Sequence, residues 1–131
     1  MSGRELFFVA GAGRLTRVNQ ILEQKPALEF KECCGRTPLI VAAEEGQVEV
    51  CKALLAAGCN KDAVSTYGWT PLMVAARFNH VAVVNMLCEA GADKTLRDMS
   101  EGGGRTALDL ARMHKHESII KLLESGSASA A

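Results

Sequence analysis

The chain has few aromatic residues, no net charge and no long apolar run. Phe, Trp and Tyr make up 5% of its 131 residues, so aliphatic and small side chains must supply most of any core. Lys and Arg number 15, as do Asp and Glu, and this balance excludes an overall field that would recruit nucleic acid or an anionic membrane. The apolar runs fall far short of a membrane span.

The chain also lacks a secretory segment of the usual shape at its start. Its five cysteines are therefore expected to be reduced thiols, which excludes a disulfide framework. We expect a cytoplasmic protein, with the nucleus as the other compartment. A length of 131 residues predicts a single domain, and a hydrophobic content of 48% is enough to pack one core.

An internal repeat is the strongest positive signal. Residues 35–43 read GRTPLIVAA and residues 68–76 read GWTPLMVAA, with the two threonines 33 residues apart. A third copy, GRTALDLA at residues 104–111, follows a connection that is longer by three residues. A degenerate copy opens the chain, with Leu6 aligned to Leu39. A fixed period of this length is typical of stacked repeats, which offer a shaped surface more readily than a buried catalytic pocket.

Each repeated residue type has a physical reason. The threonine should cap a helix, and the proline after it suits the first helical position. The Ala-Ala pair keeps this helix thin. Gly46 and Asn79 tolerate the left-handed backbone that ends it. The second helix of each unit has an apolar stripe, which in the second unit comprises Val48, Cys51, Leu54 and Leu55.

These residues resemble the ankyrin repeat, whose signature is Gly-x-Thr-Pro-Leu-His-x-Ala-Ala. The resemblance covers nearly the whole chain and implies an all-α solenoid of helix-turn-helix units joined by β-hairpin loops. It implies one domain at residues 1–126, followed by a disordered tail at 127–131. The repeats lie near 1–33, 34–66, 67–99 and 100–126. The family's usual histidine is replaced by Ile40, Met73 and Asp109, which removes a hydrogen bond between hairpins and predicts less rigid tips.

The last unit has a polar outer face. Arg112, Glu117 and Glu124 stand where the preceding units have alanine, valine and leucine or cysteine. A terminal repeat needs such a face because nothing stacks on it. We therefore expect the array to end here and the chain to be complete.

The residues that could support other chemistry have simpler interpretations. Cys51, Cys59 and Cys88 fit small buried hydrophobes. Cys33 and Cys34 fall at a hairpin tip, where they could be oxidised or bind a soft metal. Adjacent cysteines do not form the usual zinc motif, so exposed and inert thiols are favoured.

Histidine, glycine and catalytic motifs give no further site. His114 and His116 point to different faces of a helix, which disfavours a shared metal, whereas His80 matches a structural histidine of the family. Residues 11–13 and 102–104 are glycine-rich but do not continue as phosphate-binding loops. No catalytic triad or paired carboxylates are legible. We expect no enzyme activity, catalytic residue, metal or cofactor.

The resemblance implies that a protein partner binds the concave face formed by the hairpin tips and first helices. The tip positions are Cys33, Cys34, Arg36, Thr66, Tyr67, Trp69, Gly103 and Arg105, and the positions before the inter-helix turns are Glu44, Glu45, Arg77, Phe78, Met113 and His114. Three of the six aromatic residues, Tyr67, Trp69 and Phe78, fall in this set, and aromatic and arginine side chains dominate interface hot spots. Alternatively, Trp69 folds over its hairpin and Phe78 packs under a loop.

Charge on this face is mixed. Glu44 and Glu45 lie across from Arg36, Arg77 and Arg105, which suggests a partner with both charge signs, or else a solvated surface. The glycines at 102–104 lengthen the last hairpin and suggest mobility until binding, or a tolerated insertion.

The sequence therefore predicts a monomeric, non-catalytic protein-interaction module that serves as an adaptor, assembly factor or regulatory subunit. Two alternatives are an inhibitor of an enzyme such as a protein kinase and a structural scaffold without a dedicated partner. The small kinase inhibitors of the family have a shortened first helix in their second repeat. That helix is full length here, between Thr37 and Gly46.

Overall fold

The computed structural model describes residues 2–24 and 27–129, with side chains for 3–24 and 27–124. These residues form eight α-helices, and no strand is assigned within them. The helices are α1 (Ser2–Gly11), α2 (Leu15–Leu22), α3 (Pro38–Glu44), α4 (Val48–Ala56), α5 (Pro71–Arg77), α6 (Val81–Glu89), α7 (Ala107–Met113) and α8 (Glu117–Ser129). None of these helices is both long and apolar enough to cross a membrane.

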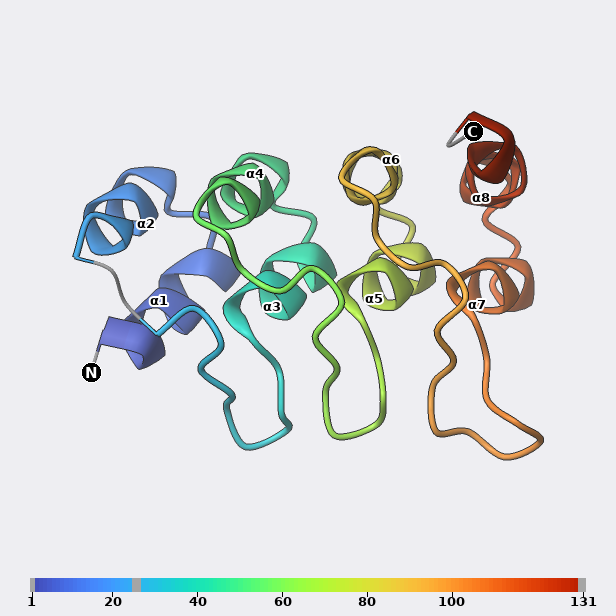
Figure 1. Cartoon of the computed structure of the whole chain (residues 1–131), viewed down its shortest axis with the longest axis horizontal. Coiled ribbons are helices and arrows are strands. Elements are labelled where there is room, and N and C mark those ends of the chain that lie inside the picture. The colour runs from blue at the N-terminus through green and yellow to red at the C-terminus, as the bar shows by residue number, and fades with distance from the viewer. Residues whose placement is uncertain (1, 25–26, 130–131) are drawn as a thin grey trace.

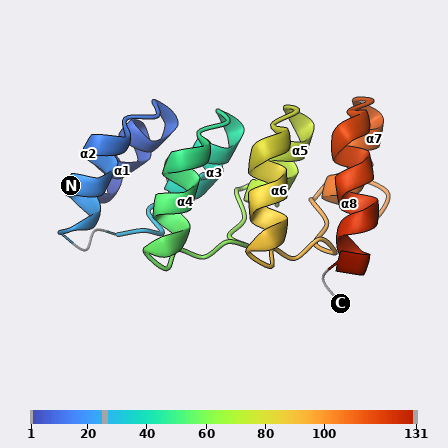
Figure 2. The same cartoon turned by 90° about the horizontal axis from the view of Figure 1, so that it is seen from above.

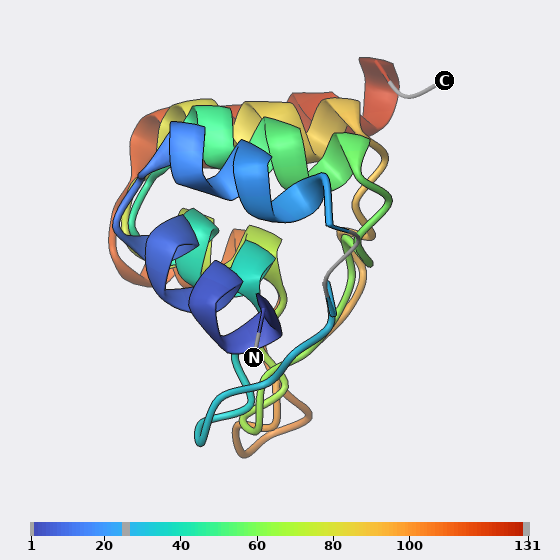
Figure 3. The ribbon, with the colours of Figure 1, turned by 90° about the vertical axis from the view of Figure 1, so that its left-hand side faces the viewer.

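The helices are arranged in two layers. Helices α1, α3, α5 and α7 form one row, which we call the inner helices. Helices α2, α4, α6 and α8 form the other row, the outer helices, and the connecting loops extend from the inner row (Figures 1 and 2). Each helix contacts its partner in the same unit and the equivalent helix of the next unit. The molecule is thus a stack of helix pairs, as the repeat predicts. Viewed along the stack, the loops project together to one side (Figure 3).

Threonine caps start three helices of the inner row. The Thr37 hydroxyl accepts a hydrogen bond from the backbone N–H of Ile40 at 3.2 Å, and Thr70 makes the equivalent contact. Pro38 directly follows its cap as the first helical residue. In the last unit Asp109 adds a second bond, because its Oδ2 accepts from the backbone N–H of Thr106 at 3.1 Å. Local side-chain chemistry therefore fixes where these helices begin.

The turn inside each unit is left-handed and packed against the next unit. Gly46 has φ of 72° and Asn79 has φ of 63°, as the sequence predicts for these positions. His80 Nε2 lies 2.7 Å from the backbone oxygen of Glu44. Because a carbonyl oxygen only accepts, this histidine carries its proton on Nε2. His80 thus links two units, which confirms its structural role.

The buried face of helix α4 differs from the predicted stripe. In α4 the buried residues are Val50, Cys51 and Leu54, whereas Val48 and Leu55 are only partly buried. The outer helix packs both on its own inner helix and on neighbouring outer helices. The predicted stripe was wrong in leaving out Val50. A stripe with the helical period of 3.6 residues describes a helix that is buried on one face, whereas this helix is buried from two directions.

The last unit differs from its neighbours at its outer face and its end. Arg112 and Glu124 are about half exposed and form an ion pair at 2.6 Å, in line with the predicted polar face. Helix α8 continues to Ser129, into the segment 127–131 where a disordered tail is predicted. Alanine and serine can extend a helix that is already packed upstream. Ala130 and Ala131 lie outside the described residues.

Candidate functional site

Three long loops lie side by side and form the edge of the molecule below the inner helices (Figures 1 and 3). We call residues 27–37, 60–70 and 92–106 the first, second and third hairpins. Each is closed by a backbone hydrogen bond: Glu32 N–H to Arg36 O at 3.1 Å, Ser65 N–H to Trp69 O at 3.0 Å, and Asp98 N–H to Arg105 O at 2.9 Å. The loops are therefore hairpin-like, as the resemblance implies.

Neighbouring hairpins are joined at their tips by backbone hydrogen bonds. The N–H of Thr66 donates to the oxygen of Cys34 at 3.1 Å, and the N–H of Met99 donates to the oxygen of Tyr67 at 3.0 Å. The prediction of less rigid tips considered only the hydrogen bond of the missing histidine. These backbone bonds between the tips do not depend on that histidine. Main-chain groups thus hold the tips in register.

Carboxylates add a second set of links near the outer helices. Glu29 accepts a hydrogen bond from the backbone N–H of Asn60 at 2.8 Å. Asp62 accepts one from the backbone N–H of Asp93 at 2.9 Å. Each hairpin is therefore tied to the next at two levels, which limits how the surface between them can deform.

A hollow of about 330 Å³ lies between the first and second hairpins and helices α3 and α5. We call it the central groove. It is lined by Cys34, Arg36, Ile40, Glu44, Ser65, Tyr67, Trp69 and Val74. The structure thus brings together five of the predicted contact residues, and Tyr67 is the most accessible of the large ones, with 65% of its surface exposed.

Trp69 is partly buried and already has two intramolecular partners. Its Nε1–H donates to Asp98 Oδ2 at 3.1 Å. The guanidinium carbon of Arg77 lies 4.6 Å from the centre of its ring. Trp69 is therefore partly used within the protein, but by the third hairpin and helix α5, whereas the alternative has it folding over its own hairpin. Phe78, which contacts the same arginine, keeps 43% of its surface exposed.

An arginine between two glutamates forms one wall of the central groove. Arg36 contacts Glu44 at 2.7 Å and Glu32 at 3.2 Å. Partial burial raises the pKa of Glu32, but hydrogen bonds from Arg36, Cys33 and Cys34 outweigh burial and lower it to about 2. Glu32 is therefore ionised at neutral pH. Much of the charge on Arg36 is neutralised within the protein.

The remaining predicted contact residues lie outside the central groove. Glu45 and Arg105 are exposed, and neither forms an ion pair within the described part of the chain. Met113 and His114 are exposed at the end of α7, in the last unit. His114 stacks on His116, with ring centres 5.9 Å apart, while Nε2 of His116 bonds to the oxygen of Arg77. This bond links His116 to the preceding unit.

Asp98 organises the third hairpin, and sequence reasoning missed it. Besides Trp69, it accepts hydrogen bonds from Ser100 and from the backbone N–H of Arg105 at 2.8 Å. Burial raises its pKa, but these hydrogen bonds outweigh burial and hold the pKa below its ordinary value. The only sequence signal is an Asp two residues before a Ser, a common turn pattern.

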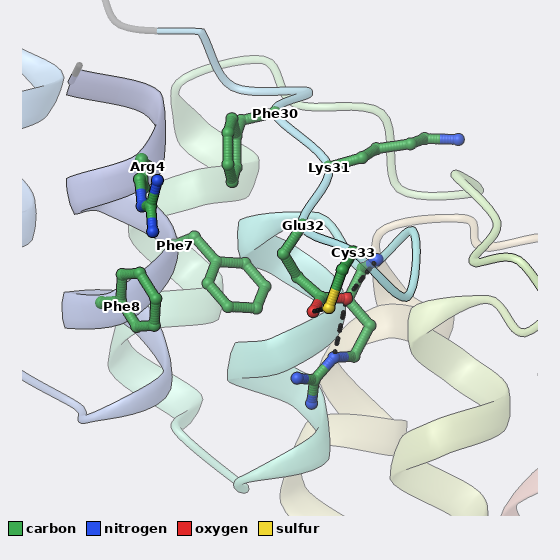
Figure 4. Close-up of a pocket in the computed structure, with 8 residues that line it drawn as sticks. Arg4, Phe7, Phe8, Phe30, Lys31, Glu32 and Cys33 are labelled. Atoms are coloured by element: carbon green, nitrogen blue, oxygen red, sulfur yellow. Dashed lines mark hydrogen bonds and ion pairs between the residues drawn. The ribbon is translucent and has the colours of Figure 1, made fainter.

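A second hollow, of about 580 Å³, lies between α1 and the first hairpin (Figure 4). We call it the N-terminal pocket. Phe7 is buried and Phe8 is 59% exposed, with their ring centres 5.4 Å apart. Phe30 contacts Phe7 from the hairpin, at 6.2 Å between centres, and Arg4 lies beside these rings. Sequence reasoning missed this pocket because the first repeat is degenerate.

The cysteines divide into two groups. Cys51 is buried and Cys59 and Cys88 are partly buried against the core, as expected for small hydrophobic residues. Burial raises the pKa of both Cys51 and Cys59 to about 12, so these thiols are poor nucleophiles. Cys33 and Cys34 are exposed at the first hairpin tip.

Comparison with known families agrees with the geometry. The family model described as ankyrin repeats (3 copies) matches residues 6–98. No curated protein matches the sequence. The match spans most of α1, all of α2 to α6, and the threonine caps at Thr37 and Thr70. This chain belongs to the ankyrin repeat family.

Proposed function

We propose that this chain is a monomeric adaptor, assembly factor or regulatory subunit that binds a protein partner through its central groove. Ankyrin repeats generally mediate protein–protein interaction and are typically non-catalytic. The observation that carries the proposal is the groove itself, in which an exposed Tyr67 lies beside charged side chains that are already fixed in place. The five cysteines of the chain are all free thiols, which supports the proposal that the protein works in a reducing compartment such as the cytoplasm or nucleus.

Rigidity of the groove supports recognition. Arg36 is held between two carboxylates, and Arg77 is stacked on Trp69. The hairpins on both sides are linked by backbone hydrogen bonds. A surface whose side chains are ordered before binding loses less conformational entropy when the partner arrives.

The proposed anchors are Tyr67, which lines the groove, and Phe78, which is not among its lining residues. Both are large, exposed and aromatic, and such side chains bury much area at a small entropic cost. Trp69 acts between them as a platform, since its N–H and one face are already in use. The charged rim comprises Arg36, Glu44, Glu45, Arg77 and Arg105, and Met113 and His114 extend the surface along the last unit.

The test is affinity capture followed by measurement with the purified partner. A protein captured by the wild-type chain is purified, and its dissociation constant is measured for Tyr67→Ala/Phe78→Ala. We expect at least a tenfold loss, since two exposed aromatic anchors are removed without disturbing the core. The matched control is Val64→Ala, which truncates an exposed apolar residue on the same hairpin outside the groove. Equal affinity of the double variant and the control would refute the assignment of the groove.

A further inference from the structure

Three potential metal ligands lie together at the tip of the first hairpin. One oxygen of Glu32 and the sulfurs of Cys33 and Cys34 all lie within 4.8 Å of one another. The Sγ of Cys33 is 3.3 Å from Glu32 Oε2, to which it donates a hydrogen bond. Both cysteines are exposed, so an ion can reach them from solvent. Figure 4 shows Glu32 and Cys33 side by side among the residues that line the N-terminal pocket.

The carboxylate of Glu32 is fixed in a way that leaves one oxygen for this cluster. Its Oε1 accepts hydrogen bonds from the backbone N–H of Cys34 at 2.8 Å and of Arg36 at 3.1 Å, and from Arg36 Nε at 3.2 Å. Its Oε2 faces the thiol of Cys33. A carboxylate held through one oxygen presents the other at a defined position, as ligating carboxylates commonly do.

The backbone that carries the two thiols is also held. The N–H of Gly35 donates to the oxygen of Glu32 at 2.8 Å, and the oxygen of Cys34 accepts from Thr66 of the second hairpin. Gly35 has φ of 77°, and a Cβ there would lie 2.7 Å from the backbone nitrogen of Thr66. The turn is therefore tight and lies against the neighbouring hairpin.

We propose that Glu32, Cys33 and Cys34 form a binding site for a thiophilic divalent cation such as Zn²⁺. Two thiolates and a carboxylate oxygen supply three ligands, of two types that this ion binds in proteins. On binding, the thiol protons leave to solvent and two metal–sulfur bonds form, with no change of oxidation state. A tetrahedral ion would keep a fourth position open toward solvent.

The charge balance around the cluster suits a divalent ion. Two thiolates and the Glu32 carboxylate bring three negative charges, and the ion leaves one uncompensated. Arg36, which is bonded to the same carboxylate and also paired with Glu44, offsets part of that charge. The site borders the central groove, which Cys34 and Arg36 also line, and it adds to the proposed function a metal that a partner could ligate at the open position.

The test is a titration of the reduced full chain with Cd²⁺, a spectroscopic substitute for Zn²⁺. Cadmium–thiolate bonds absorb in the ultraviolet, so binding is read directly. We expect one Cd²⁺ per chain, displacement by Zn²⁺, and at least a tenfold weaker affinity for Cys33→Ser and for Cys34→Ser. Glu32→Gln should weaken binding several-fold. The matched control is Cys88→Ser, which removes a partly buried thiol on α6 and should leave the affinity unchanged.

Three results would overturn the proposal. One is binding that survives either hairpin substitution, and another is binding that is lost equally in Cys88→Ser. The third is a stoichiometry of one Cd²⁺ to two chains, which would mean that a single chain does not complete a site. Circular dichroism of each variant separates loss of the site from loss of the fold.

Discussion

Replacing Asp98 by asparagine should destabilise the protein although the two side chains have nearly the same shape. Asp98 is 9% exposed, and all of its hydrogen-bond partners are donors. Its Oδ2 accepts from Trp69 Nε1 at 3.1 Å. Its Oδ1 accepts from Ser100 N–H at 3.0 Å, from the Ser100 hydroxyl, and from Arg105 N–H at 2.8 Å. Asparagine turns one of these two acceptors into a donor.

The expected loss of unfolding free energy follows from the hydrogen bonds that Asp98→Asn removes. Either orientation of the introduced amide places an NH₂ group against a donor, which removes at least one hydrogen bond to a charged group, worth about 1.5–3 kcal/mol. Water reaches part of the hairpin and offsets some of the loss, so we expect about 2 kcal/mol. Trp69→Phe removes the Nε1–H donor and part of the indole, and should cost about 1 kcal/mol. The double variant should lose less unfolding free energy than the two single variants together, with a coupling energy of about 1 kcal/mol.

The assay is urea unfolding at neutral pH, followed by circular dichroism for all four proteins of the cycle. The midpoint should fall while the slope stays constant, because the surface exposed on unfolding is unchanged. Glu101→Gln, an exposed neutralisation in the same hairpin, serves as the control and should change stability by less than about 0.5 kcal/mol. The argument is refuted if Asp98→Asn is as stable as this control, or if the two substitutions are additive.

Two further predictions concern pH and a turn. The hydrogen bonds that lower the pKa of Asp98 below 3.8 give stability that is present above the unfolded pKa and lost as pH falls through the folded pKa. The difference in unfolding free energy between wild type and Asp98→Asn should therefore shrink as acid is added below that value, and a constant difference would contradict this. Gly46→Ala should destabilise the protein more than Gly58→Ala, by about 1 kcal/mol or more. Both glycines have positive φ, but an added Cβ at Gly46 would lie 2.6 Å from the His80 ring, whereas no atom lies within 4 Å of an added Cβ at Gly58. Equal midpoints in urea would refute the steric argument.

Much of the fold could be predicted because its determinants are local. The threonine cap, the following proline and the left-handed turn each act within a few residues, and the 33-residue period identifies them. The stack then follows from the need of each thin helix pair to bury its apolar face on the next. Predictions failed where burial came from two directions, as at Val50 on α4.

The candidate site was only partly predictable, for a different physical reason. Repeat alignment locates the positions that face the concave side, and five of the predicted residues do line one groove. Alignment does not show which side chains already form contacts with neighbouring hairpins. Asp98 bonds to Trp69 across 29 positions of sequence, and Phe30 meets Phe7 across a gap of similar length. Such contacts depend on the registry between units, which no local pattern specifies.

The use of Trp69 within the protein makes Tyr67, and not Trp69, the aromatic residue of the second hairpin that should dominate binding. A hot-spot residue contributes most when its ring and polar group are both free to be buried by the partner. In Trp69 the indole N–H is bonded to Asp98, and Arg77 lies over one face of the ring. Truncating it would therefore disturb the link between the second and third hairpins as well as the surface. Tyr67 is 65% exposed at the tip of the same hairpin, and its backbone oxygen already fixes its position against Met99. We therefore expect Tyr67→Ala to lower partner affinity with little effect on the urea midpoint, and Trp69→Ala to lower both.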